Sequence, residues 1–413
     1  LPAPDEQLKP LFVGPPLEYS FRNFMKIPEE RVWEAVAAYR ERYVVKGCYE
    51  NRVFPGVRRL MGTLKKQGAF VGVCTGKPEP ATRLILKYFG LDKWIDAVTC
   101  ATDGHAEKDV GGRMIDLRVS SMPTIHGEKM VIRILDKTNA FLDLGRLSFS
   151  AQNLAAYRSL FSCPHGMVLV TGPTGSGKST TLYATLSELN KPETNIITIE
   201  DPVEYQLFGV NQMALNAKAG LHFANGLRSI VRQDPDIIMV GEIRDEETAH
   251  IAVQAALTGH LVFSTMHTNN AVGAITRLLD MGIEPYLVAS CLRGVVAQRL
   301  VRKVCQECQE RYEAGVAELA CLHLPVDESH YLVGASGCVE CFGIGYVGRL
   351  PIQEVLTVDE NMRNLIVQGA TEKELLTYAR SKGFRSLYED GVDKVLSGVT
   401  TLSELLKAVG TEG

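Results

Sequence analysis

The sequence of 413 residues lacks the marks of several protein classes. No apolar run approaches the roughly 20 residues that a membrane-spanning helix needs, and no stretch resembles a signal peptide. We find no internal repeat and no low-complexity segment. Basic residues are not in excess, since 44 Lys and Arg face 48 Asp and Glu. This balance argues against a nucleic-acid-binding protein, which usually carries a basic domain.

The remaining composition is that of a globular protein, with 46% hydrophobic and 22% charged residues. The length predicts about two to four domains. Charge is distributed unevenly, because residues 1–100 carry 16 Lys and Arg against 11 Asp and Glu, whereas the rest carries 28 against 37. We therefore expect two parts of different origin. Cysteines of ordinary number, four of them in a metal-binding rather than a disulfide pattern, lead us to expect a cytoplasmic protein.

Strands and helices alternate in two regions of the sequence. In residues 1–100, a buried strand over 69–74 is followed by a loop and a helix over about 79–88. Residues 145–283 show the same alternation over a longer stretch. This pattern predicts α/β units, each with a parallel sheet.

The regions between and after these units differ in pattern. Residues 115–119 and 129–135 alternate apolar and polar side chains, as half-buried strands do. Residues 284–413 contain cysteine pairs and otherwise mostly helical patterns. We predict four parts, with the boundaries 1–100, 101–143, 144–283 and 284–413.

A phosphate-binding loop is predicted by Gly172-Pro-Thr-Gly-Ser-Gly-Lys178-Ser179, which fits G-x-x-x-x-G-K-[ST] at every fixed position. An apolar strand precedes it and a helix-forming run follows. Glycines let backbone N–H groups turn toward a phosphate, while Lys178 can bind the β- and γ-phosphates and Ser179 can bind Mg²⁺. The alternative is a glycine-rich turn that only closes a βα unit. The predicted nucleotide-binding residues are Gly172, Pro173, Thr174, Gly175, Ser176, Gly177, Lys178, Ser179 and Thr180.

Carboxylates follow two further strands of the same region. Glu200 and Glu204 follow one strand, and Glu242 follows another. Ligands of doubly wound sheets bind outside the carboxyl ends of the strands, which is where these groups are expected. We predict that Glu242 activates the attacking water and that the other two support the metal and water network. The alternative is that they are solvated acids at strand ends.

Histidine and arginine residues lie near the predicted site. His260 and His267 are candidates for sensing the γ-phosphate, although a lone histidine is more often a structural residue. Arg228, Arg232 and Arg244 flank the strand before the candidate base. Arginines near a phosphate can stabilise transferred charge, sometimes across a subunit boundary. The alternative for the arginines is a solvated helix face or a surface ion pair.

Four cysteines form two pairs, Cys305-x2-Cys308 and Cys338-x2-Cys341, separated by 29 residues. Four thiolates in this spacing predict a closed tetrahedral Zn²⁺ site with a structural role. Four free thiols and an iron–sulfur cluster are the alternatives.

Residues from about 103 to 413 resemble the hexameric ATPases of type II secretion and type IV pilus assembly. The resemblance implies a RecA-like ATPase domain that works as a homo-hexamer with ATP, Mg²⁺ and Zn²⁺. The matching segments are Asp116-Leu-Arg118-Val-Ser-Ser-Met-Pro-Thr124, His126-Gly-Glu-Lys129, the phosphate loop, Ile199-Glu-Asp-Pro-Val-Glu-Tyr205, Arg232-Gln-Asp-Pro-Asp-Ile-Ile-Met-Val-Gly-Glu-Ile-Arg-Asp245, Thr258-Gly-His260 to His267-Thr268, Ala297-Gln-Arg-Leu-Val-Arg302, the cysteine pairs and Gly398-Val-Thr-Thr-Leu402.

The same resemblance implies how such a motor works. Nucleotide lies between a small N-terminal domain and the ATPase domain, and Arg118 and Arg133 occupy the places of arginines that reach the phosphates. Domain rotation moves an inner-membrane platform protein, and the four-cysteine site favours secretion and pilus extension. Membrane association is implied only through partners, at the inner face of the inner membrane.

Residues 1–100 instead resemble haloacid-dehalogenase-type phosphatases of the phosphoglycolate phosphatase kind. Thr75 matches the second phosphatase motif, but no DxD nucleophile precedes it and no GDxxxD-like motif follows before a junction near Thr99–Gly104. We therefore predict that this fragment is catalytically inactive. The segments that carry the resemblance are Phe54-Pro-Gly-Val57, Val71-Gly-Val-Cys-Thr75-Gly-Lys-Pro78 and Tyr88-Phe-Gly-Leu91.

The expected fold is therefore α/β. It combines a RecA-like ATPase domain, a partial small α+β domain, a mostly helical zinc-containing C-terminal region and a phosphatase-like N-terminal fragment. Two alternatives to a working motor stay open. One is a fragment or fusion that binds nucleotide and zinc without assembling. The other is a phosphatase whose C-terminal half is regulatory.

Overall fold

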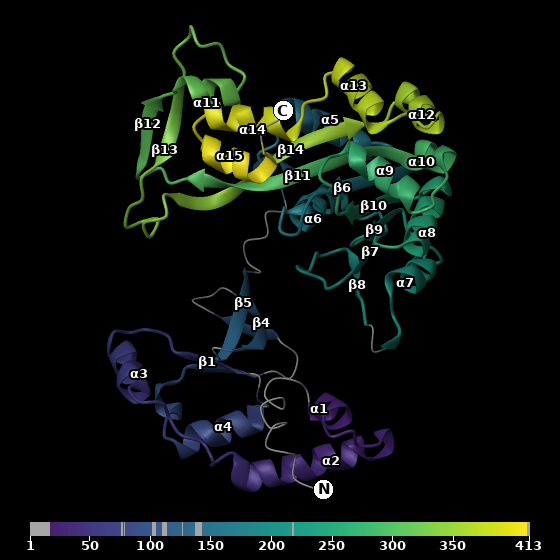
Figure 1. The fold of residues 1–413 in the computed structure, drawn as a ribbon. Coiled ribbons are helices and arrows are strands. Elements are labelled where there is room, and N and C mark those ends of the chain that lie inside the picture. Colours follow the sequence, from purple (N-terminus) through teal and green to yellow (C-terminus); the bar gives the residue numbers. More distant parts are fainter. Residues whose placement is uncertain are drawn as a thin grey trace. The chain divides into compact units, whose positions relative to one another are not determined.

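The chain divides into two compact units, Leu1–Asn139 and Ala140–Gly413, which are described separately. No helix in the described ranges combines the length and the apolarity that crossing a membrane requires. The predictions on Gly76, Pro78 and His126 and on residues 101–104 of the junction lie outside the described residues. The computed structural model (Figure 1) describes residues 17–75, 77, 79–100, 105–109, 114–125, 127–136, 143–216 and 219–410.

The first unit begins with a small α/β arrangement. Strands β1 (Gly72–Thr75) and β2 (Ala97–Cys100) are parallel, and helix α4 (Glu79–Tyr88) lies between them in the chain. The predicted strand and helix are confirmed, although β1 begins three residues later than predicted. The other elements are α1 (Leu17–Asn23), α2 (Glu29–Arg42), a π-helix (Tyr43–Gly47), α3 (Val57–Lys66) and a 3₁₀-helix (Asp92–Trp94).

A three-stranded antiparallel sheet completes the first unit. Its order is β3 (His105–Asp109), β4 (Met114–Thr124) and β5 (Gly127–Asp136). The two strands predicted from alternating residues are therefore confirmed and are longer than predicted. Within the sheet, Arg118 lies directly opposite Arg133 in the register.

The second unit is built on a seven-stranded sheet in the order β14-β11-β6-β10-β9-β7-β8. All neighbouring strands are parallel except β14, which runs antiparallel to β11. The parallel sheet predicted for this region is confirmed. The strands are β6 (Gly166–Thr171), β7 (Ile196–Glu200), β8 (Asn211–Ala214), β9 (Ile237–Val240), β10 (Leu261–Met266), β11 (Leu292–Val304) and β14 (Tyr346–Thr357).

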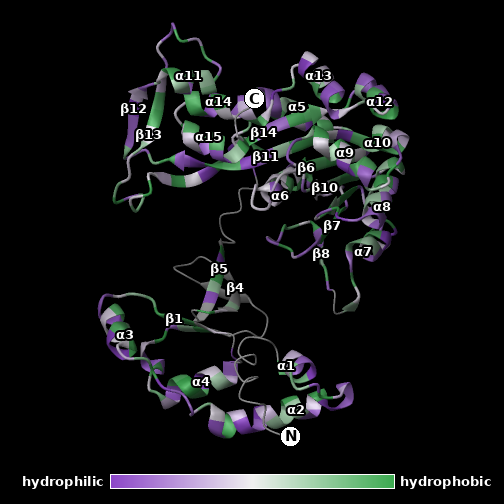
Figure 2. Ribbon diagram, viewed as in Figure 1, coloured by the Kyte–Doolittle hydropathy of each residue, from purple (hydrophilic) through white to green (hydrophobic). Residues whose placement is uncertain are grey.

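Helices cover both faces of this sheet, so its central strands are buried on both sides (Figure 1). Val168 and Val170 of β6 pack in one core with α5 and α6, whereas Met167 and Leu169 face the core formed with most of the other helices. Figure 2 shows apolar residues along these strands. A 3₁₀-helix (Leu144–Arg146) precedes the helices α5 (Ala151–Phe161), α6 (Lys178–Leu189), α7 (Phe223–Ile230), α8 (Glu246–Leu257), α9 (Val272–Asp280), α10 (Pro285–Cys291), α12 (Glu360–Val367), α13 (Glu372–Ser381), α14 (Leu387–Leu396) and α15 (Leu402–Val409).

The prediction of mostly helical structure after residue 283 is wrong for its first half. Strands β11 and β14 extend the central sheet there. Between them lie helix α11 (Val316–Cys321) and a hairpin of β12 (Gln309–Glu313) and β13 (Tyr331–Ala335). The sequence of β11 shows little alternation of apolar and polar residues, because β11 lies between two strands and is buried on both faces. Pro351 lies within β14, where it is tolerated because β14 is an edge strand of the sheet.

Candidate functional site

The phosphate loop connects the carboxyl end of β6 to the first residue of α6. Gly172 and Gly177 both have positive φ, at 146° and 88°. A Cβ at Gly172 would lie 2.3 Å from the carbonyl oxygen of Gln298. The sequence therefore places glycine where a side chain would be both strained and obstructed.

Lys178 folds back into this loop. Its Nζ donates hydrogen bonds to the carbonyl oxygens of Gly172 at 2.8 Å and Pro173 at 3.1 Å. Burial lowers the pKa of Lys178, and the negative charge of Glu242 acts in the opposite direction. The ammonium group is thus held at the mouth of the loop by acceptors that a phosphate can replace.

The chemistry of the loop fits a nucleotide phosphate. The hydroxyl Oγ of Ser176 is buried and, among the described residues, has no hydrogen-bond partner. Ser179 is exposed and Thr180 half-buried in the first turn of α6. Backbone N–H groups at a helix N-terminus, together with a lysine, form an anion-binding site. ATP phosphates would be held by these groups, and Mg²⁺ by Ser179.

Glu242 lies at the same edge of the sheet, because β6, β9 and β10 are parallel and β9 ends at Val240, opposite Ser264 near the end of β10. Its Oε1 is 2.6 Å from Nη2 of Arg244, and its Oε2 is 3.5 Å from Nε2 of His267. The Glu242 side chain is 13% exposed. Glu242 raises the pKa of Arg244. A carboxylate between two basic groups and near Lys178 can orient a water molecule toward a bound phosphate.

His267 is held in place by the residue that follows it. The backbone N–H of Thr268 donates to Oγ1 of Thr171 at 2.9 Å, and the two threonine hydroxyls are 2.6 Å apart. Because Thr171 is the last residue of β6, the histidine segment is fixed beside the phosphate loop.

Glu200 is buried at the end of β7, and both of its carboxylate oxygens accept hydrogen bonds from other side chains. Its Oε1 accepts from Thr198 at 2.6 Å and from Gln212 at 3.1 Å, and its Oε2 accepts from the hydroxyl of Tyr183. That hydroxyl also accepts the backbone N–H of Glu204 at 3.1 Å. Burial, followed by the charge of Glu200, raises the pKa of Tyr183. This network ties the segment after β7 to α6.

His260 does not lie beside the phosphate loop, which corrects the prediction that both histidines do. It precedes Leu261, which pairs with Gly166 at the first residue of β6. The six residues of β10 separate the two histidines by about 20 Å. The ring Nδ1 of His260 lies 2.9 Å from the carbonyl oxygen of Ala255, near the end of α8.

The predicted arginines are spread over both units. Arg228 forms an exposed ion pair of 2.6 Å with Glu247, and Arg232 is exposed shortly before β9, at the amino edge of the sheet. Arg133 is exposed on β5 opposite Arg118 of β4, in the first unit.

The four predicted cysteines lie together, with their sulfur atoms all within 4.8 Å of one another. Three separations are 3.9 Å for Cys305–Cys338, 3.7 Å for Cys308–Cys341 and 3.7 Å for Cys338–Cys341. A tetrahedral Zn²⁺ with Zn–S bonds of about 2.3 Å places sulfur atoms about 3.8 Å apart. Hydrogen bonds from the N–H groups of Cys338 and Gly345 lower the pKa of Cys341 to about 6. The cluster therefore fits a closed zinc site.

Two buried polar residues were missed by sequence reasoning. Gln298 of β11 contacts the phosphate loop. Glu354 of β14 accepts the N–H of Ala271 at 2.6 Å and that of Leu387 at 2.9 Å, so one carboxylate caps the starts of α9 and α14. Both strands also carry other polar and charged residues, so the available signal for either residue was weak.

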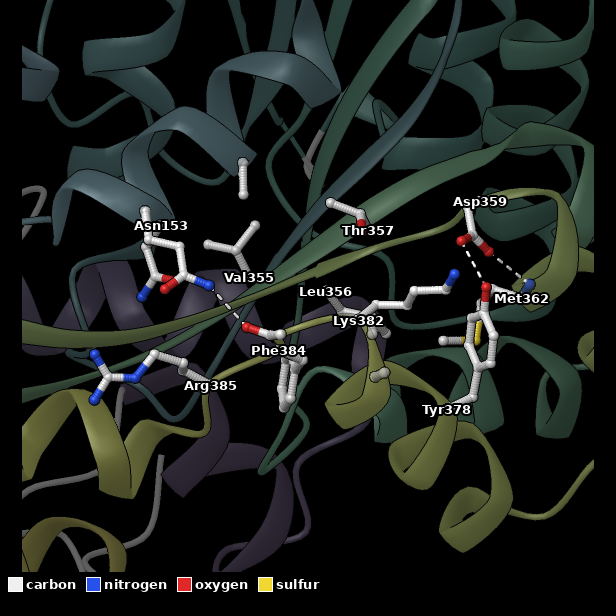
Figure 3. A pocket seen from close by; sticks show the side chains of 14 residues that line it. Asn153, Val355, Leu356, Thr357, Asp359, Met362, Tyr378, Lys382, Phe384 and Arg385 are labelled. Carbon is white, nitrogen blue, oxygen red and sulfur yellow. Dashed lines mark hydrogen bonds between the residues drawn. The ribbon is translucent and has the colours of Figure 1, made fainter.

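A separate cavity of about 80 Å³ lies between α5, β14 and α13 (Figure 3). Asp359 there accepts from the N–H of Met362 at 2.8 Å and from Tyr378 at 2.7 Å, and Gln152 donates to Gly383. None of the predicted site residues lines it. Its polar groups largely satisfy one another, and we assign it no ligand.

The chain matches two protein families. Residues 95–407 match the family described as Type II/IV secretion system protein. Residues 2–111 match the haloacid dehalogenase-like hydrolase family. The two matches overlap where the sequence predicted a junction.

Curated relatives of the longer match are secretion proteins. The chain is 52% identical over 310 residues to Type II secretion system protein E of Pseudomonas aeruginosa, covering 75% of this chain and 62% of that protein. It is 52% identical over 305 residues to Type II secretion system ATPase E of Vibrio cholerae, covering 74% and 60%. The chain therefore spans about three fifths of the length of these relatives.

Solved structures agree with this match. The pilus retraction motor PilT with bound ADP has a TM-score of 0.53 and 25% identity, covering 80% of this chain and 84% of that one. The Legionella pneumophila ATPase DotB shares the fold, with a TM-score of 0.53 and 22% identity over 73% and 75%. Together with the match over residues 95–407, this shows that the chain belongs to the family of type II/IV secretion system proteins.

Proposed function

We propose that the second unit of this chain binds and hydrolyses ATP. The observation that carries the proposal is the position of the phosphate loop, with Lys178 folded into it, at the carboxyl edge of the sheet where Glu242 contacts His267. A phosphate-binding lysine and a water-orienting carboxylate are two groups that phosphate-loop hydrolysis requires.

The residues divide the chemistry among them. Lys178 leaves the carbonyl groups of its loop and binds the β- and γ-phosphates, while the loop N–H groups hold the same anion. Glu242 orients the attacking water, and His267 lies where it can respond to the γ-phosphate. Mg²⁺, held by Ser179, would neutralise phosphate charge.

Other residues support this arrangement. Glu200 fixes the segment after β7 rather than contacting the metal directly, since its oxygens accept protein hydrogen bonds. Glu204 extends the same network. Arg118 and Arg133 would reach the phosphates from the small domain. Arg228 and Arg232 would stabilise transferred charge, either within the subunit or across a subunit boundary.

At the level of the assembly, we propose a homo-hexameric motor for type II secretion or type IV pilus assembly. It would act in the cytoplasm at the inner face of the inner membrane and would move a platform protein there. The relative named Type II secretion system ATPase E supports this role. Zn²⁺ at the four cysteines would hold together the two ends of the segment that contains the β12–β13 hairpin.

A second candidate is a nucleotide- and zinc-binding fragment without motor activity. It is favoured by the length of the chain, which spans about three fifths of the relatives it matches. The phosphatase-like residues before the junction would be inactive in either case. A phosphatase regulated by the second unit has no such support.

The deciding experiment measures Mg²⁺-dependent phosphate release from ATP and the affinity for ATP in the same preparations. Glu242→Gln should bind ATP but lose hydrolysis by about 100-fold or more, because the water is no longer activated. Lys178→Ala should lose binding. Glu188→Gln, on the exposed end of α6, and Lys191→Ala serve as matched controls.

Full turnover by Glu242→Gln would remove the assignment of the base. Binding without hydrolysis in the unaltered chain, at concentrations that permit assembly, would support the fragment instead of the motor.

A further inference from the structure

Gln298 lies beneath the phosphate loop. It follows Ala297, which pairs with Thr171 where β6 ends, and its side chain is 1% exposed. Its Nε2 donates to the carbonyl oxygen of Ser176 at 2.7 Å, and its Oε1 accepts from the hydroxyl of Thr181 at 2.8 Å. One amide group therefore joins the end of the loop to the first turn of α6.

The loop also packs against Gln298 at both of its ends. A Cβ at Gly172 would lie 2.3 Å from the Gln298 carbonyl oxygen, and one at Gly177 would lie 3.0 Å from its Nε2. The loop can approach Gln298 this closely only because Gly172 and Gly177 have no side chains.

A neighbouring glutamine shows that burial alone does not explain the contacts that Gln298 makes with the phosphate loop. Gln353 of β14 pairs directly with Gln298 and is 0% exposed. In the described structure, neither polar atom of its side chain has a hydrogen-bond partner. The two residues are both buried glutamines and are partners across neighbouring strands, but only Gln298 contacts the loop.

We propose that Gln298 is a positioning residue that holds the phosphate loop in the shape that receives the β-phosphate of a nucleotide. This inference rests on the nucleotide binding proposed above. The carbonyl and N–H groups of one trans peptide point in opposite directions. Fixing the Ser176 carbonyl on Gln298 therefore turns the N–H of Gly177 away from β11. That N–H is one of the loop donors available to an anion.

The test compares the affinities of the full chain for ADP and AMP, because only ADP has a β-phosphate. In Gln298→Leu, the affinity for ADP should fall by at least about 10-fold, since the loop loses its anchor. The affinity for AMP should change by less than about threefold. Gln353→Leu is the matched control, and both of its affinities should equal those of the unaltered chain.

A second variant guards against misfolding. Gln298→Met keeps the length and the neutrality of the side chain but removes the donor to Ser176 and the acceptor for Thr181, so the same selective loss is expected. Thermal unfolding of each variant checks that the fold is intact.

The outcomes separate the two proposals. If the unaltered chain does not prefer ADP to AMP, the proposed nucleotide site itself fails. If it does, and both Gln298 variants bind ADP as tightly as the unaltered chain, the positioning role is wrong. Equal losses for ADP and AMP would also overturn it, because they indicate general disruption.

Discussion

The imidazole Nε2 of His267 lies 3.5 Å from Oε2 of Glu242, although the two residues follow different strands of the sheet. The contact exists because β9 and β10 are parallel neighbours whose carboxyl ends meet at one edge. It gives the proposed water-orienting carboxylate a neighbour that can respond to phosphate.

His267→Ala should lower ATP hydrolysis by about 10- to 100-fold with little change in ATP affinity, because the contact to Glu242 is lost. His260→Ala should leave hydrolysis within about threefold. It should instead lower stability by about 1 kcal/mol, since the ring bonds a carbonyl near the end of α8. Phosphate release and urea unfolding measure the two effects. Equal loss of hydrolysis in both variants would contradict the separation of their roles.

The four-cysteine cluster predicts about one zinc ion per chain. The double variant Cys305→Ser with Cys308→Ser should lose that zinc, and it should unfold at lower temperature because the metal would join the segment directly after β11 to the cysteines just before β14. Metal analysis and thermal unfolding check this. Cys163→Ser with Cys321→Ser is the control and should retain the zinc. Full zinc content in the first variant would refute the site.

Glu404 predicts that the free energy of unfolding depends on pH in the acid range. Its carboxylate accepts two hydrogen bonds from Arg302, at 2.7 and 2.8 Å, which lower its pKa to about 2 from the usual 4.5. A carboxyl group whose pKa is lower in the folded state than in the unfolded state stabilises the fold at pH values above its unfolded-state pKa. This contribution to stability is lost as the pH falls from about 4.5 to about 2. Since the Arg302 side chain is 40% exposed, we expect about 1 kcal/mol.

Urea unfolding of Glu404→Gln and the unaltered chain should therefore differ near neutral pH and converge toward pH 2. A difference that stays constant over this range would show that the pair contributes through packing instead of charge.

Glu354→Gln tests the carboxylate that caps two helices. A glutamine keeps one acceptor oxygen, so the N–H of either Ala271 or Leu387 loses its partner. Leaving one buried donor unpaired should lower stability by about 1–3 kcal/mol. Glu360→Gln, at the exposed start of α12, is the control in the same urea titration. An unchanged free energy of unfolding would mean that the cap is dispensable.

The phosphate loop, the strand-end acids and the cysteine pairs could be predicted because each depends on local order. Glycines around Lys178, a carboxylate directly after an apolar strand and two C-x2-C pairs are short-range patterns whose chemistry follows from spacing. The helix over 246–257 was predictable for the same reason, since its acidic first turn and apolar spacing lie within one segment.

The rest required the tertiary structure, because it depends on which strands become neighbours. His260 and His267 are seven residues apart in the sequence, yet an extended strand places them at opposite edges of the sheet. Gln298 and Glu354 gain their roles only because β11 joins β6 and β14 joins β11. The sequence by itself determined the chemical groups of this protein, whereas the order of strands in the sheet decided which of those groups meet.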